Sequence, residues 1–154
     1  MIRKAVFSGK FYPDNSHELK DFIEKYAEDV RQKGSYEALN KLGLILPHAG
    51  YIYSGRTAIK AVNKASLLIE PKSIVVIGTN HTGLGSAVCS VWDDGEWETP
   101  FGSIEVDSEI SKKLIESSSL FSVDYSAHLY EHSIEVQLPI LQYFFRGFKI
   151  VPII

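Results

Sequence analysis

The sequence is poor in cysteine and has no long run of charge of one sign. Cys89 is its single cysteine, and one cysteine can form neither an internal disulfide framework nor a CxxC metal site. Any metal must therefore be bound through His, Asp or Glu. No run of Lys or Arg exceeds two residues and the formal net charge is −3, which argues against a nucleic-acid partner.

Long hydrophobic segments and several familiar site motifs are also missing. The apolar runs fall far short of the roughly 20 residues of a membrane-spanning helix, and the N-terminus lacks the apolar core of a signal peptide. We therefore expect a cytoplasmic protein with no membrane partner. The sequence contains no GxGxxG, P-loop, GxSxG or HExxH motif, so we expect no nucleotide cofactor.

The 154 residues, 45% of them hydrophobic, suffice for one globular domain with a sizeable core. A helix is predicted from Asn15, which forms a capping box with Glu18, to a stop at Gly34. Its buried stripe consists of apolar residues at helical spacing, namely Leu19, Phe22, Ile23, Tyr26, Ala27 and Val30.

Two continuous apolar runs, "LGLIL" at 42–46 and "SIVVIG" at 73–78, are typical of strands buried on both faces. A short helix beginning near Ser54 connects them, and "FKIVPII" at 148–154 predicts a third buried strand. This strand–helix–strand pattern predicts an α/β fold with a layered, largely parallel sheet flanked by helices.

The region 85–106 differs, because short extended segments are broken by Asp-Gly and Pro-Phe-Gly turns. It predicts an antiparallel excursion. A helix capped by Asp107 or Ser108 follows. A further helix is expected from about Glu131 to Gly147, kinked or split at Pro139 because proline removes a hydrogen-bond donor.

His48 and His81 each follow a predicted strand closely and are bordered by glycines. If the strands are neighbours, both imidazoles lie at the carboxyl edge of the sheet, where ligands bind in α/β folds. Two such histidines supply half or more of the ligands of iron, copper or zinc. Alternatively, each is a turn residue bonded to nearby backbone. The residues alone leave both interpretations open. His17, in the first turn of the first helix, is expected to be solvated.

Glu131 and His132 lie at the start of the last predicted helix, with His128 in the preceding loop. They form an acid/base pair or line the same pocket; alternatively, Glu131 only stabilises the helix N-terminus. Aromatic residues flank these loops and either wall a pocket or belong to the core, namely Phe11, Tyr12, Tyr51 and Tyr53.

Six blocks occur in a recognisable order: "SGKFYP", "PHAGYIYSG", "VIGTNHTG", "WETPFGSIEVD", "EHSIEVQLPILQ" and "FKIVPII". With these blocks the whole chain resembles the Memo family, whose fold is like that of class III extradiol dioxygenases. A Memo protein is roughly twice as long, within the usual range of domain sizes. The resemblance therefore implies a truncated domain: residues 1–154 are the N-terminal half of a single Memo-like domain, and the C-terminal half is absent from this chain.

The resemblance implies that His48 and His81 are metal ligands and that a further histidine and a cysteine lie past Ile154. It also implies that the family's pocket is lined at Phe11, Tyr53 and Asn80. The expected function is a metal-dependent oxidoreductase that uses Fe(II) or copper on a small or aromatic substrate, with His132, beside Glu131, moving protons. The alternative is a non-catalytic module that binds a peptide or partner protein in the same pocket. The implied partners are the remainder of the domain or a second chain, and a radical SAM protein and an AMMECR-like protein of a shared pathway.

Overall fold

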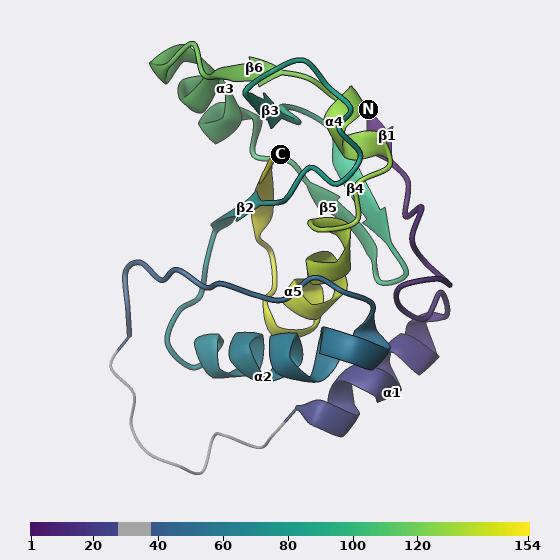
Figure 1. Ribbon diagram of the computed structural model, residues 1–154. Helices are drawn as coiled ribbons and strands as arrows, with labels where there is room; N and C mark the ends of the chain where they lie inside the picture. The colour runs from purple at the N-terminus through teal and green to yellow at the C-terminus, as the bar shows by residue number, and fades with distance from the viewer. Residues whose placement is uncertain (28–37) are drawn as a thin grey trace.

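Two mixed β-sheets with helices packed around them form the protein (Figure 1). The computed structural model describes residues 1–27 and 38–154. The α-helices are α1 (Ser16–Tyr26), α2 (Arg56–Ala65), α3 (Ser108–Ser117), α4 (Ser126–Leu129) and α5 (Leu138–Phe144). A π-helical turn, η2 (Tyr51–Gly55), precedes α2, and a 3-10 turn, η3 (Glu135–Gln137), precedes α5. The strands are β1 (Ile2–Arg3), β2 (Ser73–Ile77), β3 (Cys89–Val91), β4 (Glu96–Thr99), β5 (Gly102–Glu105), β6 (Phe121–Val123) and β7 (Lys149–Ile153).

The sheet topology confirms the α/β class and corrects the expectation of one largely parallel sheet. The larger sheet has the order β2-β7-β3-β6, with β7 parallel to β2 and antiparallel to β3. The smaller sheet has the order β1-β4-β5. Its β4–β5 hairpin confirms the antiparallel excursion at 85–106. The prediction of a single sheet was wrong because the hairpin pairs with the N-terminal strand β1 instead of joining the larger sheet.

The prediction of a strand at 42–46 was wrong. This segment has no strand pairing, and Ile45 is fully exposed. β2 is a strand as predicted, but Val75 and Ile77 are exposed, so it is not buried on both faces. An apolar run becomes a buried strand only where a neighbour pairs with it, and within the described residues no strand pairs with the outer edge of β2.

The helix predictions hold in their main features. The Asn15 side chain caps α1 by accepting hydrogen bonds from the backbone N–H groups of His17 and Glu18. The helix ends at Tyr26, and the predicted continuation to Val30 and Gly34 lies outside the described residues. Asp107 caps α3. The last helix is split as Pro139 predicts, because η3 ends where α5 begins and the proline lies in the first turn of α5. Its predicted bounds were wrong: residues 131–134 are not helical, and α5 ends at Phe144, before Gly147.

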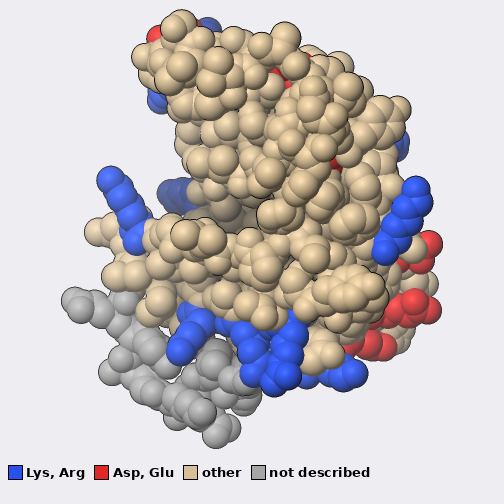
Figure 2. Space-filling model, in the orientation of Figure 1, with Lys and Arg blue, Asp and Glu red and all other residues tan. Residues whose placement is uncertain are grey.

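One main core joins the helices to the sheets. α1, α2 and α5 gather at one end of the molecule (Figure 1) and contact one another. A smaller cluster beside α3 consists of Val91, Val151 and Ile153 with the apolar residues around them. In the described part of the chain, no helix combines the length and the apolar character needed to cross a membrane. Basic side chains gather over α2 and acidic ones over α1 (Figure 2).

Candidate metal centre

Three histidines from distant parts of the chain meet at one place. The ring centroids of His48 and His81 lie 5.1 Å apart, and those of His48 and His132 lie 5.8 Å apart. His81 and His132 are stacked, with centroids 4.5 Å apart and an interplanar angle of 26°. Each ring offers one nitrogen, and these nitrogens all lie within 4.8 Å of one another.

The loop after β2 carries His81 and is fixed against residues 131–137. The backbone N–H of Thr79 donates to Ser133 Oγ at 3.0 Å, and that hydroxyl donates to the Thr79 carbonyl at 3.1 Å. Gly78 permits this close approach, because a Cβ there would lie 2.5 Å from Ser133 Oγ and 2.7 Å from Ile134. The loop therefore has little freedom to carry His81 away.

Glu131 holds the ring of His81. Its side chain is 1% exposed, and its carboxylate lies 2.9 Å from His81 Nδ1 and accepts the backbone N–H groups of His81 and Ser133. Burial raises the pKa of Glu131, but these hydrogen bonds outweigh it and bring the pKa to about 2. The group is therefore ionised and accepts Nδ1–H, which leaves the lone pair of His81 on Nε2 for a metal ion.

His132 lies between the other two histidines and an aromatic wall. Its ring centroid is 4.6 Å from that of Phe11 and 5.6 Å from that of Phe7. Burial lowers the pKa of His132, although the nearby Glu131 opposes the shift, and the neighbouring His81 and His48 lower it further. The neutral imidazole favoured in this way is the form that binds metal.

The segment that carries His48 is held by the same residues, 131–137. Gln137 Nε2 donates to the Pro47 carbonyl at 2.9 Å, one residue before His48. The Tyr51 hydroxyl donates to the Val136 carbonyl at 2.8 Å. One short segment thus supplies His132 and positions both other histidines.

The structure brings some of the predicted site residues together and separates others. His48 and His81 meet as expected, although not through neighbouring strands. Phe11 packs against His132. Asn80 is occupied in its own turn, where its side chain accepts from the Gly83 N–H and donates to the Leu84 carbonyl. Tyr53 is largely exposed.

Sequence reasoning missed or misplaced several residues around this centre. His128 is not in a loop but fully buried in α4, because its ring packs against Trp92 and Trp97. Phe7, Ser133 and Gln137 were not predicted to take part. Ser133 and Gln137 lie in the same block as Glu131 and His132, and that adjacency was the available signal. His17 is exposed, as predicted.

The donor set fits a transition-metal ion. Imidazole nitrogens bind zinc, copper and iron, and they lie at about 2.0–2.1 Å from zinc. Nitrogens at that distance around one ion are themselves about 3–3.5 Å apart, so small side-chain rotations bring the three rings into position. The carboxylate of Glu131 supplies the orienting hydrogen bond that metal-binding histidines usually make.

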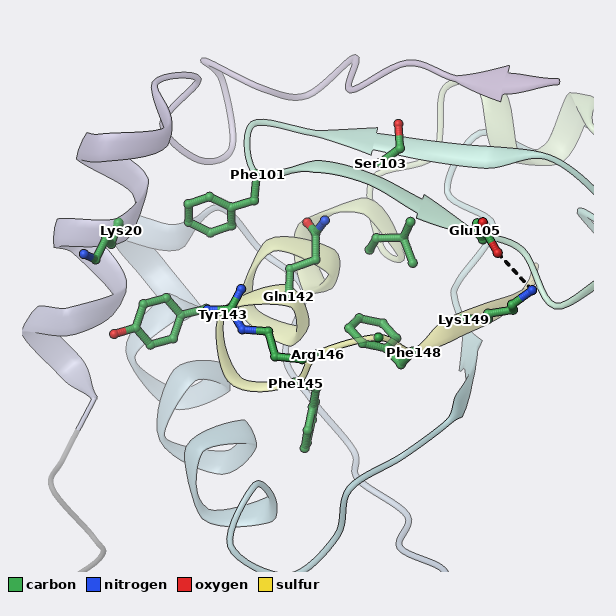
Figure 3. A pocket seen from close by; sticks show the side chains of 12 residues that line it. Lys20, Phe101, Ser103, Glu105, Gln142, Tyr143, Phe145, Arg146, Phe148 and Lys149 are labelled. Carbon is green, nitrogen blue, oxygen red and sulfur yellow. Dashed lines mark ion pairs between the residues drawn. The ribbon is translucent and has the colours of Figure 1, made fainter.

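A separate hollow of about 650 Å³ lies between α1, the β4–β5 turn and the turn after α5 (Figure 3). Its walls carry Phe101, Tyr143 and Phe148. Three basic residues also line it, Lys20, Arg146 and Lys149, and Lys149 is paired with Glu105 at 2.9 Å. It shares no lining residue with the three histidines. Convergent donor atoms, and not volume, define a candidate metal centre, and within the described residues such atoms come together at the three histidines.

Comparison with known proteins identifies a family. A family model described as Memo-like protein matches residues 3–154. A MEMO1 family protein of Metallosphaera sedula is 41% identical over 160 residues, which cover 100% of this chain and 56% of the relative. Those of Sulfolobus acidocaldarius and Methanobrevibacter smithii are 43% and 44% identical, each over 100% of this chain and 57% of the relative. The chain thus spans little more than half the length of these curated relatives.

Proposed function

Because the chain belongs to the Memo-like family, we propose that it binds one iron or copper ion through His48, His81 and His132. The observation that supports this most is the convergence of three ring nitrogens within 4.8 Å of one another. Glu131 serves as the positioning residue that fixes His81. This assignment gives His132 the role of a ligand, where the sequence predicted a proton carrier.

The proposed activity is that of a metal-dependent oxidoreductase acting on a small or aromatic substrate. When bound, iron or copper supplies redox chemistry that no side chain here provides. His81 is partly exposed, so a small molecule can approach the ring cluster from solvent. Phe7 and Phe11 give that approach an aromatic wall suited to a planar substrate. Reversible oxidation of the copper-loaded protein, followed by electron paramagnetic resonance, checks the redox role.

We expect the metal-free chain to take up one zinc ion, used as a redox-silent probe. Replacing His48, His81 or His132 with alanine should each lower zinc affinity by more than about 100-fold, because a lost ligand costs more than a lost supporting hydrogen bond. Competition titration against a chromophoric chelator measures this. The matched control is His17→Ala, since His17 is exposed and distant in sequence from the cluster. Full affinity in His132→Ala would contradict the three-histidine assignment.

Replacing Glu131 with glutamine should weaken metal binding by about 10–100-fold while leaving the three ligands in place. Glutamine has a single acceptor oxygen, so it cannot replace both carboxylate oxygens, of which Oε2 accepts the His81 N–H and Oε1 the Ser133 N–H. It also removes the charge that strengthens the hydrogen bond from His81 Nδ1–H. The same titration measures the loss, with Glu98→Gln as the surface control. An unchanged affinity in Glu131→Gln would mean that Glu131 only stabilises the fold.

A second candidate function is a binding module, favoured by the large exposed side chains Ile52 and Tyr53 shortly after His48. Exposed apolar and aromatic side chains beside the site suit the binding of a peptide. Metal content separates the two functions: a protein that takes up no metal and still binds a partner through this surface is a module.

A further inference from the structure

A hollow of about 590 Å³ is lined by β2 and by residues of the segment 40–48, which include His48. The surface is hollowed between the part over α2 and the part over the larger sheet (Figure 2). Its lining includes all five residues of β2, so it runs along the whole strand. Most of the other lining side chains are apolar, among them Leu44, Leu46, Ile69 and Leu141.

β2 presents an open edge to this hollow. Every residue of β2 pairs with β7 on one side, and within the described residues nothing pairs with the other. The backbone N–H of Gly78 donates to the Ile153 carbonyl of β7. Because N–H groups alternate in direction along a strand, those of Val75 and Ile77 point to the open edge. Unpaired backbone groups beside exposed apolar side chains are a template for another strand.

We propose that an extended, apolar polypeptide strand occupies this hollow and pairs with the open edge of β2. A strand satisfies the outward backbone groups of Val75 and Ile77 together. A small apolar molecule fills the volume but cannot pair with a strand edge along its length. The strand comes from the polypeptide that the relatives carry outside the matched region, since this chain spans 56–57% of their length.

The test is co-expression of this chain with the part of the Sulfolobus acidocaldarius relative that lies outside the match. We expect a 1:1 complex that stays together through size-exclusion chromatography with light scattering. In hydrogen exchange, the amides of Val75 and Ile77 should become at least about 10-fold slower in the complex. The amide of Val123 on β6, at the opposite edge of the same sheet, should not change.

The matched variants are Val75→Pro and Val123→Pro. Both valines lie on edge strands and are about half exposed, at 52% and 45%. The Asp124 N–H donates to Val91 of β3, so by the same alternation the N–H of Val123 points away from the sheet. Proline at either site removes one outward donor and leaves the inner ladder intact. Val75→Pro should weaken the complex more than about 10-fold, and Val123→Pro should not.

Three results would overturn the proposal: no complex, a complex equally tight in Val75→Pro, or occupation of the hollow by a second copy of this chain, seen as concentration-dependent dimerisation. If Val75→Pro does not fold, as judged by circular dichroism, the amide exchange of the unmodified pair decides the outcome. Binding of a small apolar ligand that leaves the Val75 and Ile77 amides unprotected also counts against a strand.

Discussion

Replacing Arg3 with methionine is expected to lower the free energy of unfolding by roughly 3–5 kcal/mol. Arg3 and Glu135 are both buried and form an ion pair at 2.5 Å. Methionine removes the positive charge and leaves the Glu135 carboxylate buried without it, which is the costly way to break a buried pair. For a domain whose total stability is typically about 5–15 kcal/mol, urea denaturation followed by tryptophan fluorescence will show the loss plainly.

Two further variants test whether the lost stability comes from the unpaired buried charge of Glu135 or only from replacing a basic side chain. Lys4→Met removes a neighbouring cation from an exposed pair with Glu98 at 3.2 Å, and its cost should stay below about 1 kcal/mol. Adding Glu135→Gln to Arg3→Met should recover part of the loss, since no unpaired charge is then buried. Equal losses in Arg3→Met and Lys4→Met would show that the ion pair contributes little.

The Arg3 network also bears on the metal centre. The guanidinium donates to the carbonyls of His128 and Glu131 at 2.9 and 2.8 Å. On the other side of the pair, Glu135 accepts from the Tyr12 hydroxyl and the Phe7 N–H. The N-terminal strand therefore clamps the segment that carries Glu131 and His132, and in Arg3→Met we expect weaker metal binding to accompany the lower stability.

Acidification from pH 6.5 to pH 4 should cost up to roughly 3 kcal/mol of stability through His128 alone. Burial lowers the pKa of His128 from its ordinary 6.5 to about 4, although the hydrogen bond to the Ser90 carbonyl opposes the shift. Nε2 donates to that carbonyl, and Nδ1 has no partner in the described structure. The folded protein therefore keeps the ring neutral, between Trp92 and Trp97.

The direction of this effect follows from the two pKa values. Between pH 6.5 and 4 the unfolded chain binds a proton at His128 that the folded chain does not, so the stability present above pH 6.5 is lost as the pH falls. His128→Gln has no titrating ring, and its stability should fall less over this range. The test compares urea midpoints at several pH values, with His17→Gln as the surface control. Parallel curves for His128→Gln and the unmodified protein would contradict the prediction.

Local signals in the sequence predicted local structure well. The Asn15 cap, the Asp107 cap and the break at Pro139 each depend on one residue acting on its own turn, and all three are found. The strand predicted at 42–46 does not form, because an apolar run indicates only that burial is favourable. Whether a strand forms depends on a pairing partner that its own residues do not specify.

The candidate site was half predictable. His48 and His81 were placed together by their positions after apolar runs, but the reason was incorrect, since Gln137 and Glu131 hold them and not adjacent strands. The part played by residues 131–137 requires contacts between segments 50 to 90 positions apart in sequence, which periodicity cannot reveal. Arg3 was missed for a related reason: arginine is seldom buried unless it is paired, and its partner lies 132 residues away.

The predicted half-domain, the dioxygenase-like fold and the cytoplasmic location stay predictions, as do the radical SAM and AMMECR-like partners. Cys89, on β3, remains outside the proposed chemistry. The half-domain and the partners concern the part of the relatives that this chain does not cover. The three-histidine centre depends only on residues of this chain.

X-ray absorption spectroscopy of the zinc-loaded chain tests the central claim most directly. Three imidazole ligands on one ion predict nitrogen scattering at about 2.0–2.1 Å with strong outer-shell features from the rings. In His132→Ala those ring features should fall by about one third, in proportion to the loss of one of three rings. A spectrum with no imidazole contribution, or one unchanged by His132→Ala, would contradict the proposed metal centre.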